Sequence, residues 1–144
     1  MANLKKNFSD ALEFVNNKVC FLRCDLNLPI VNNKITDFTR LDEIIPTLEK
    51  LISRNSKIVL ISHLGRPKGK VDENLSLEIM IPHIEERLKK SIFFCKEGIL
   101  STETEEKIKK LPPKGVLLLE NIRFHKQEEE NDKKFSSKIS EYGD

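Results

Sequence analysis

The 144-residue chain carries 25 Lys and Arg against 23 Asp and Glu, so its formal net charge is only +2. This near balance excludes binding to nucleic acids or membranes through bulk charge, and any anion site must come from local placement of Lys and Arg. Hydrophobic residues make up 38% and charged residues 33%, which is typical of one folded domain, expected to span residues 1–144.

Four short apolar segments, at residues 19–22, 58–61, 92–95 and 116–119, are predicted as strands. Amphipathic patterns between them predict helices over residues 41–52, 80–88 and 103–110, and a last pattern uses Phe135 and Ile139. Pro46 is expected to kink the first helix or to lie in its first turn. Ser76 is a candidate cap for the second helix, and the prolines at 112 and 113 end the third.

This alternation of strand and helix predicts right-handed crossovers and a mostly parallel sheet with helices on both faces. The expected fold class is therefore α/β, a three-layer α/β/α arrangement of the Rossmann-like kind. In such sheets ligands bind beyond the carboxyl ends of the strands.

Three of the four predicted strands are followed directly by polar clusters. These are Arg23, Asp25 and Asn27; then Ser62, His63 and Arg66; then Glu120, Asn121 and Arg123. Parallel strands would bring all three clusters to one edge of the sheet. Because the planar guanidinium of Arg donates two parallel hydrogen bonds to phosphate or carboxylate, the clusters predict a site for a small, multiply charged anion.

Four segments resemble motifs of the phosphoglycerate kinases and follow the order of that family. They are RCDLNLP (23–29), ITDFTR (35–40), SHLGRPKGK (62–70) and LLLENIRF (117–124), within a resemblance covering residues 15–144. The resemblance implies a two-domain glycolytic and gluconeogenic transferase that moves a phosphoryl group reversibly between 1,3-bisphosphoglycerate and ADP, giving 3-phosphoglycerate and ATP. This chain would be the incomplete amino-terminal, substrate-binding domain.

The same resemblance assigns roles to individual residues. Asp25 and Asn27 would contact the hydroxyl and carboxyl end of the glycerate, and Arg40 would face the acyl carboxylate and stabilise the phosphoryl group in transfer. The 3-phosphate would be held by His63, Arg66 and Arg123. The family usually has a polar residue where this chain has Phe38, which we expect to pack against a helix and leave Arg40 available.

The cofactor expectations follow from the same resemblance. Mg²⁺ with ADP or ATP would bind the carboxy-terminal domain, which we expect to be absent here. No GxxxxGK[ST] or GxGxxG pattern occurs, and no group of His, Cys or carboxylates has metal-ligand spacing, so no nucleotide or metal site is predicted in this chain. The isolated chain is expected to be inactive, with weak affinity for the glycerate.

The three cysteines, Cys20, Cys24 and Cys95, are odd in number and form no CxxC pair, which favours free thiols in a reducing cytoplasm. Cys20 and Cys24 are expected to be small apolar side chains on one strand face. No apolar stretch is long enough for a signal peptide or a membrane span, so no membrane partner is expected.

Several alternatives remain open. Arg23 is expected to be structural, paired with an acid inside the fold, and His83 and His125 to be structural or solvent-exposed. A non-enzymatic phosphometabolite-binding module is the second functional hypothesis. A nucleic-acid binder using Lys and Arg of residues 57–70 is a third, and a dehydrogenase domain would need a glycine-rich turn after the first strand. The family is expected to be monomeric, whereas an unpaired sheet edge would let the shortened chain self-associate.

Overall fold

The computed structural model describes residues 12–97, 101–125, 133, 137 and 140–141. Its strands are β1 (Val19–Arg23), β2 (Ile30–Val31), β3 (Lys34–Ile35), β4 (Lys57–Ile61), β5 (Phe93–Cys95) and β6 (Val116–Leu119). Its helices are α2 (Thr39–Ser53), α3 (Ile81–Leu88) and α4 (Thr102–Lys110), with 3-10 turns η1 (Glu73–Leu75), η2 (Leu77–Met80) and η3 (Ile122–Phe124). The predicted helix using Phe135 and Ile139 lies outside the described residues.

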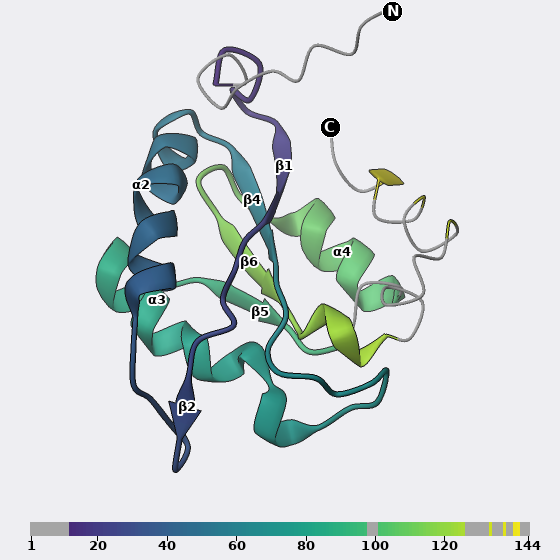
Figure 1. The fold of residues 1–144 in the computed structure, drawn as a ribbon. Helices are drawn as coiled ribbons and strands as arrows, with labels where there is room; N and C mark the ends of the chain where they lie inside the picture. The colour runs from purple at the N-terminus through teal and green to yellow at the C-terminus, as the bar shows by residue number, and fades with distance from the viewer. Residues whose placement is uncertain (1–11, 98–100, 126–132, 134–136, 138–139, 142–144) are drawn as a thin grey trace, which may run out of the picture.

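The main sheet contains four parallel strands in the order β1-β4-β6-β5 (Figure 1). All four strands match the predicted segments to within one residue at either end. Within the described part of the chain, β1 and β5 are therefore the edge strands. Whether an edge promotes self-association stays a prediction.

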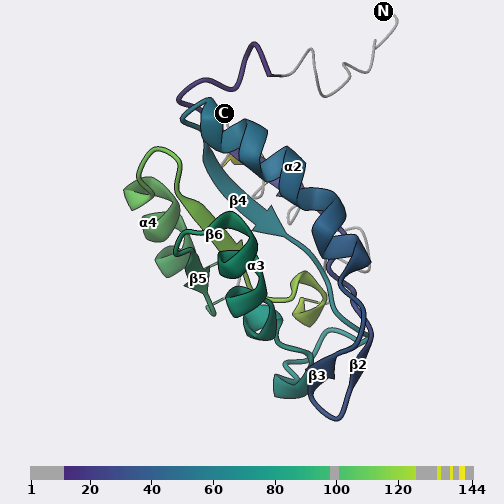
Figure 2. The ribbon, with the colours of Figure 1, turned by 90° about the vertical axis from the view of Figure 1, so that its left-hand side faces the viewer.

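Alternate residues of the central strands face opposite sides of the sheet. Ile58 and Leu60 of β4 pack in one cluster with buried residues of α2 and α3, whereas Val59 and Ile61 pack with Ile108 of α4. Figure 1 shows α2 and α3 on one side of the sheet and α4 on the other, and Figure 2 views the sheet from the side of α2 and α3. The predicted three-layer α/β/α class is confirmed.

Helix α2 buries one apolar stripe, formed by Leu41, Leu48 and Leu51. Pro46 lies in the interior of this 15-residue helix and not in its first turn, so of the two expected alternatives the kink stays a prediction. A proline in the helix interior has no N–H to donate, and the carbonyl four residues earlier, at Asp42, loses its usual partner. The apolar stripe on the sheet outweighs this local cost.

The loop expected around Asn32 and Asn33 is the turn of a two-residue β-hairpin between β2 and β3. Both asparagines have positive φ, 51° and 60°, as a type I′ turn requires, and Asn is tolerated there. The predicted cap at Ser76 is confirmed, since its side chain accepts a hydrogen bond from Glu78 N. The helix expected at residues 80–88 is preceded by η2 and begins at Ile81.

The cysteines are free thiols that behave as apolar side chains. Cys20 and Cys24 are half-buried against the same core cluster, which agrees with their expected common face. Cys95 is fully buried on the opposite side of the sheet.

Candidate functional site

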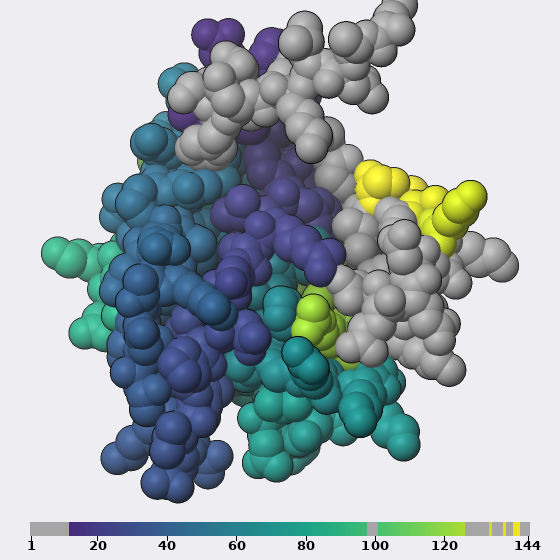
Figure 3. Space-filling view, in the orientation of Figure 1, coloured from purple at the N-terminus to yellow at the C-terminus, as the bar shows by residue number. Residues whose placement is uncertain are grey.

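The loops that follow β1, β4 and β6 lie together at the carboxyl edge of the sheet. The register pairs Arg23 with Ile61, so β1 and β4 end level with one another. Ser62 joins all three loops, because its hydroxyl accepts from Leu26 N at 2.9 Å and its carbonyl accepts from Ile122 N at 3.1 Å. In Figure 3 the purple β1 loop, the teal segment after β4 and the yellow-green end of β6 meet on one face.

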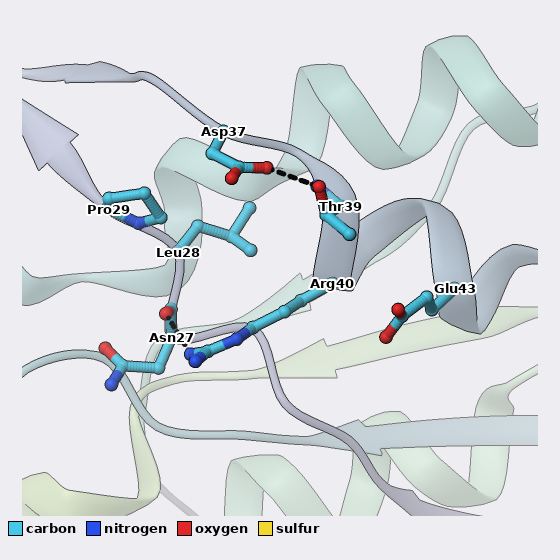
Figure 4. A pocket seen from close by; sticks show the side chains of 7 residues that line it. All are labelled: Asn27, Leu28, Pro29, Asp37, Thr39, Arg40 and Glu43. Atoms are coloured by element: carbon cyan, nitrogen blue, oxygen red, sulfur yellow. Dashed lines mark hydrogen bonds between the residues drawn. The ribbon is translucent and has the colours of Figure 1, made fainter.

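Asp25, Asn27 and Arg40 form one directly bonded half of this site. The Arg40 guanidinium donates from Nη1 to the Asn27 carbonyl at 2.8 Å and lies 3.4 Å from Asp25 Oδ1. The same Asp25 oxygen accepts from Asn27 N at 3.1 Å. Figure 4 shows the Arg40 side chain reaching from α2 across to Asn27. The structure therefore brings three sequence-predicted residues into contact.

An open pocket of about 640 Å³ lies beside Arg40 (Figure 4). Its walls are formed by Asn27, Leu28, Pro29, Asp37, Thr39, Arg40 and Glu43. Of the predicted ligands only Asn27 and Arg40 line it, so the pocket covers one side of the expected site and includes none of His63, Arg66 and Arg123.

The start of α2 explains why Arg40 points to this pocket. Asp37 Oδ1 accepts from Thr39 N at 2.8 Å and from Thr39 Oγ1 at 2.6 Å, which orders the first turn. These hydrogen bonds, with a smaller contribution from the Arg40 charge, lower the pKa of Asp37. Phe38 turns the other way and packs on α3, 4.7 Å from the His83 ring and under the Arg87 guanidinium. The expected packing of Phe38 is confirmed, and Arg40 remains exposed.

His63, Arg66 and Arg123 form the second half of the expected site. They lie on the loops after β4 and β6, which are joined by backbone bonds such as Gly69 N to Arg123 O at 3.2 Å. Arg66 is exposed, whereas His63 and Arg123 are half-buried. Within the described residues, Arg123 Nε is buried and has no hydrogen-bond partner, which is unusual for a buried donor.

Arg23 and the two remaining histidines lie outside this cluster. Arg23 is exposed at the end of β1 and not inside the fold as expected, whereas its structural role through pairing with an acid stays a prediction. The strand ends at the surface there, and the next inward position is taken by Leu26, which is fully buried. His83 packs on Phe38, and His125 is half-buried, which lowers the pKa of its imidazole.

Glu120 and Asn121 have structural roles that the sequence motifs did not reveal. Glu120, only 7% exposed, accepts from Ser76 Oγ at 2.6 Å, from Leu77 N at 2.9 Å and from Asn121 N at 2.8 Å. Asn121 is fully buried. The available signal was the direct continuation of an apolar strand by polar residues, which predicts buried polar groups with several partners.

The Cys24 thiol, next to Asp25 in the chain, resists ionisation. Burial, followed by the adjacent Asp25 carboxylate, raises the pKa of the Cys24 thiol to about 12. Among residues 12–97, 101–125 and the four described later positions, no group of three or more His, Cys, Asp or Glu is placed to hold a metal ion. No helix in this described part is long and apolar enough to cross a membrane.

Comparison with known proteins gives consistent results. The family model described as phosphoglycerate kinase matches residues 10–144. The chain is 44% identical over 139 residues to the phosphoglycerate kinase of Orientia tsutsugamushi strain Ikeda, covering 96% of this chain and 34% of that relative. It is 38% identical over 142 residues to the enzyme of Nautilia profundicola, covering 98% and 35% respectively.

Solved structures agree with these sequence matches. The phosphoglycerate kinase of Coxiella burnetii superimposes with a TM-score of 0.78 at 30% identity, covering 88% of this chain and 31% of that one. The Pyrococcus horikoshii enzyme gives a TM-score of 0.79 at 30% identity, covering 90% and 33%. The chain thus spans about a third of the length of the relatives it matches.

Proposed function

The chain belongs to the phosphoglycerate kinase family, and from this membership we propose that it supplies the 3-phosphoglycerate site of that enzyme. The activity would be reversible phosphoryl transfer between 1,3-bisphosphoglycerate and ADP. One observation carries the proposal: the loops after β1, β4 and β6, which bear Asn27, Arg66 and Arg123, converge at the carboxyl edge of the parallel sheet, where this fold class binds its ligands. Arg40 reaches the first of these loops from α2.

In the proposed complex the Asp25 half binds the glycerate and the Arg123 half binds its 3-phosphate. The Asn27 side-chain oxygen already accepts from Gly65 N at 3.0 Å, so its Nδ2 group would donate to the substrate. Asp25 uses Oδ1 for its bonds to Arg40 and Asn27, which leaves Oδ2 for a substrate hydroxyl.

Arg40 is the proposed catalytic residue. Phosphoryl transfer depends on positioning and on stabilisation of charge on the equatorial oxygens, with little covalent help from protein. The Arg40 guanidinium is exposed and, among the described residues, is held by Asn27 O and by the longer contact to Asp25, so it can turn from these partners to the acyl phosphate.

The 3-phosphate would be held by Arg66, Arg123 and His63. Each charge-assisted hydrogen bond contributes about 1.5–3 kcal/mol, so several of them offset the entropy lost on binding a small ligand. The unpartnered Arg123 Nε gains its missing acceptor in this arrangement.

Mg²⁺ and the nucleotide would bind elsewhere in the full-length enzyme. The described residues contain no carboxylate cluster that fits Mg²⁺, so no step of the proposal passes through the metal. We propose that this chain alone binds the glycerate weakly and does not transfer phosphate, and that the enzyme works in the cytoplasm as a monomer.

The proposal is tested by calorimetric titration of 3-phosphoglycerate into the chain at low salt. Arg66→Ala should weaken binding by about tenfold or more, because one charge-assisted contact is lost. Arg54→Ala is the matched control, since Arg54 is an exposed arginine at the opposite end of the sheet, after α2. Equal affinity in wild type and Arg66→Ala, or no binding by a folded wild-type chain, would contradict the proposal.

A further inference from the structure

The peptide group between Leu64 and Gly65 is held by two asparagine side chains, one on each side. Its N–H donates to Asn27 Oδ1 at 3.0 Å, and its carbonyl accepts from Asn121 Nδ2 at 2.8 Å. Both distances are those of good hydrogen bonds. The peptide lies between His63 and Arg66, two of the proposed phosphate ligands, so whatever fixes it also fixes their backbone positions.

Of the two asparagines, Asn121 holds the backbone at more points, because its amide group contacts three chain segments. Nδ2 donates to Leu64 O and also to Leu75 O, at 2.9 Å, while Oδ1 accepts from Arg123 N at 3.1 Å. Both donors and the acceptor of the amide are therefore in use. The side chain is fully buried, so water cannot replace these bonds if they break.

Gly65 shows how little freedom the held peptide has. Its φ is +63°, and an added Cβ would lie 2.6 Å from Leu75 Cδ2. The backbone passes against the very residue whose carbonyl Asn121 also binds. A shift of the peptide would thus break two asparagine bonds, and the space beside it admits no larger residue than glycine without movement of Leu75.

We infer that Asn121 is a positioning residue for the phosphate half of the site. It does not touch the substrate; it acts by fixing the backbone of Leu64 and of Arg123, and so the places from which His63, Arg66 and Arg123 reach the 3-phosphate. The inference rests on the proposed function. Asp25 and Arg40 are held by each other and by Asn27, without Asn121, so the glycerate half should keep its geometry when the Asn121 amide is removed.

The test compares two ligands that differ only in the phosphate, 3-phosphoglycerate and D-glycerate, by NMR chemical-shift titration of the chain. Asn121→Ala should weaken binding of 3-phosphoglycerate by about tenfold, the effect of losing one well-placed charge-assisted contact, and change that of D-glycerate by less than about twofold. A purely structural role would weaken both ligands alike.

Thr104→Ala is the matched control. Thr104 is also a fully buried polar residue with side-chain hydrogen bonds, to Cys95 and Ser101, but it lies on α4 across the sheet. It should lower stability and leave the ratio of the two affinities unchanged.

Gly65→Ala provides a second test should Asn121→Ala not fold. It leaves Asn121 intact but displaces the held peptide, and with it the partner of Asn27 Oδ1, so it should weaken both ligands but 3-phosphoglycerate by clearly more. An equal loss for both ligands, or no loss, in the folded variant would overturn the inference. A wild-type chain that binds neither ligand would instead contradict the proposed function.

Discussion

Cations gather at both ends of the sheet, and the two ends use them differently. At the amino end, the segments 54–57, 89–92 and 109–115 carry Lys and Arg and no Asp or Glu. These residues are Arg54, Lys57, Lys89, Lys90, Lys109, Lys110 and Lys114. Most follow the carboxyl ends of α2, α3 and α4, where a positive charge stabilises the exposed carbonyl groups. Lys90 donates instead to the Lys114 carbonyl, in the turn before β6.

At the carboxyl end, buried polar side chains connect the loops that carry the cations. Ser62, Glu120 and Asn121 are all at most 7% exposed, and their hydrogen bonds connect the loops on which His63 and Arg123 lie. The comparison teaches that a count of cations does not locate an anion site. Buried polar side chains that hold the backbone on which the cations lie indicate an anion site more specifically.

The largest expected effect tests these buried side chains. Glu120→Ala should lower the free energy of unfolding by about 3 kcal/mol, because the N–H groups of Leu77 and Asn121 lose their buried acceptor. Glu120→Gln keeps the Oε1 acceptor and should cost clearly less. Denaturant unfolding followed by circular dichroism measures both.

Glu85→Ala is the comparison at the amino end. Glu85 Oε1 also accepts a backbone N–H, that of Ile92 at 3.0 Å, but it makes this single bond from a half-buried position. Its replacement should cost about 1 kcal/mol. A loss as large as that of Glu120→Ala would show that the two ends of the sheet depend on buried carboxylates to the same degree.

The sequence predicted the strands well because their signal is local. Each of β1, β4 and β6 is an apolar run, buried in β4 and β6 and half-buried at the β1 edge, and parallel pairing then follows from the alternation with helices. The hairpin β2–β3 was predicted only as a loop, since two-residue strands carry almost no periodic signal. The sequence left the place of Pro46 open between a kink and the first turn, because the packing of Leu41 and Leu48 that keeps it in the helix interior is tertiary.

The sequence predicted which residues form the candidate site better than it predicted how their side chains are arranged. Strand ends placed Asp25, Asn27 and Arg123 on one edge without any side-chain information. The contact between Arg40 and Asn27 O depends on where α2 begins, and the roles of Glu120 and Asn121 depend on partners 43 to 57 residues away in the chain. Such long-range polar pairings leave no spacing pattern in the sequence.

A smaller expected effect is a difference between the two ends of the sheet in how their residues make stability depend on pH. Burial raises the pKa of Cys24, at the carboxyl end of β1, from 9.0 to about 12, so the folded chain keeps this proton when the unfolded chain loses it. The stability that the neutral thiol provides is present below about pH 9 and is lost as the pH rises towards 12. By pH 10 the loss should reach about 1 kcal/mol, and Cys24→Ala should abolish it.

Lys90, at the amino end, should act in the opposite direction. Burial, followed by the nearby Lys114 charge, lowers the pKa of its ammonium group. The unfolded chain then holds this proton to higher pH than the folded chain, so the Lys90 contribution to stability rises with pH below 10.5. Denaturation midpoints of wild type, Cys24→Ala and Lys90→Met at pH 8, 9 and 10 separate the two effects, and parallel curves for all three would contradict both.

The smallest expected effect concerns the turn before β6. Lys114 has a φ of +68° in a turn that is closed by Gly115 N donating to Pro112 O at 2.9 Å. The turn begins at Pro112, with Pro113 second and Lys114 third. Glycine adopts the positive φ of this third position without strain. Lys114→Gly should therefore raise stability by about 0.5 kcal/mol, after the greater freedom of glycine in the unfolded chain is deducted. Since the cation removed belongs to the amino end, affinity for 3-phosphoglycerate should not change. A weaker affinity would mean that lysines far from the carboxyl edge contribute to anion binding, and that the two ends of the sheet do not divide their roles.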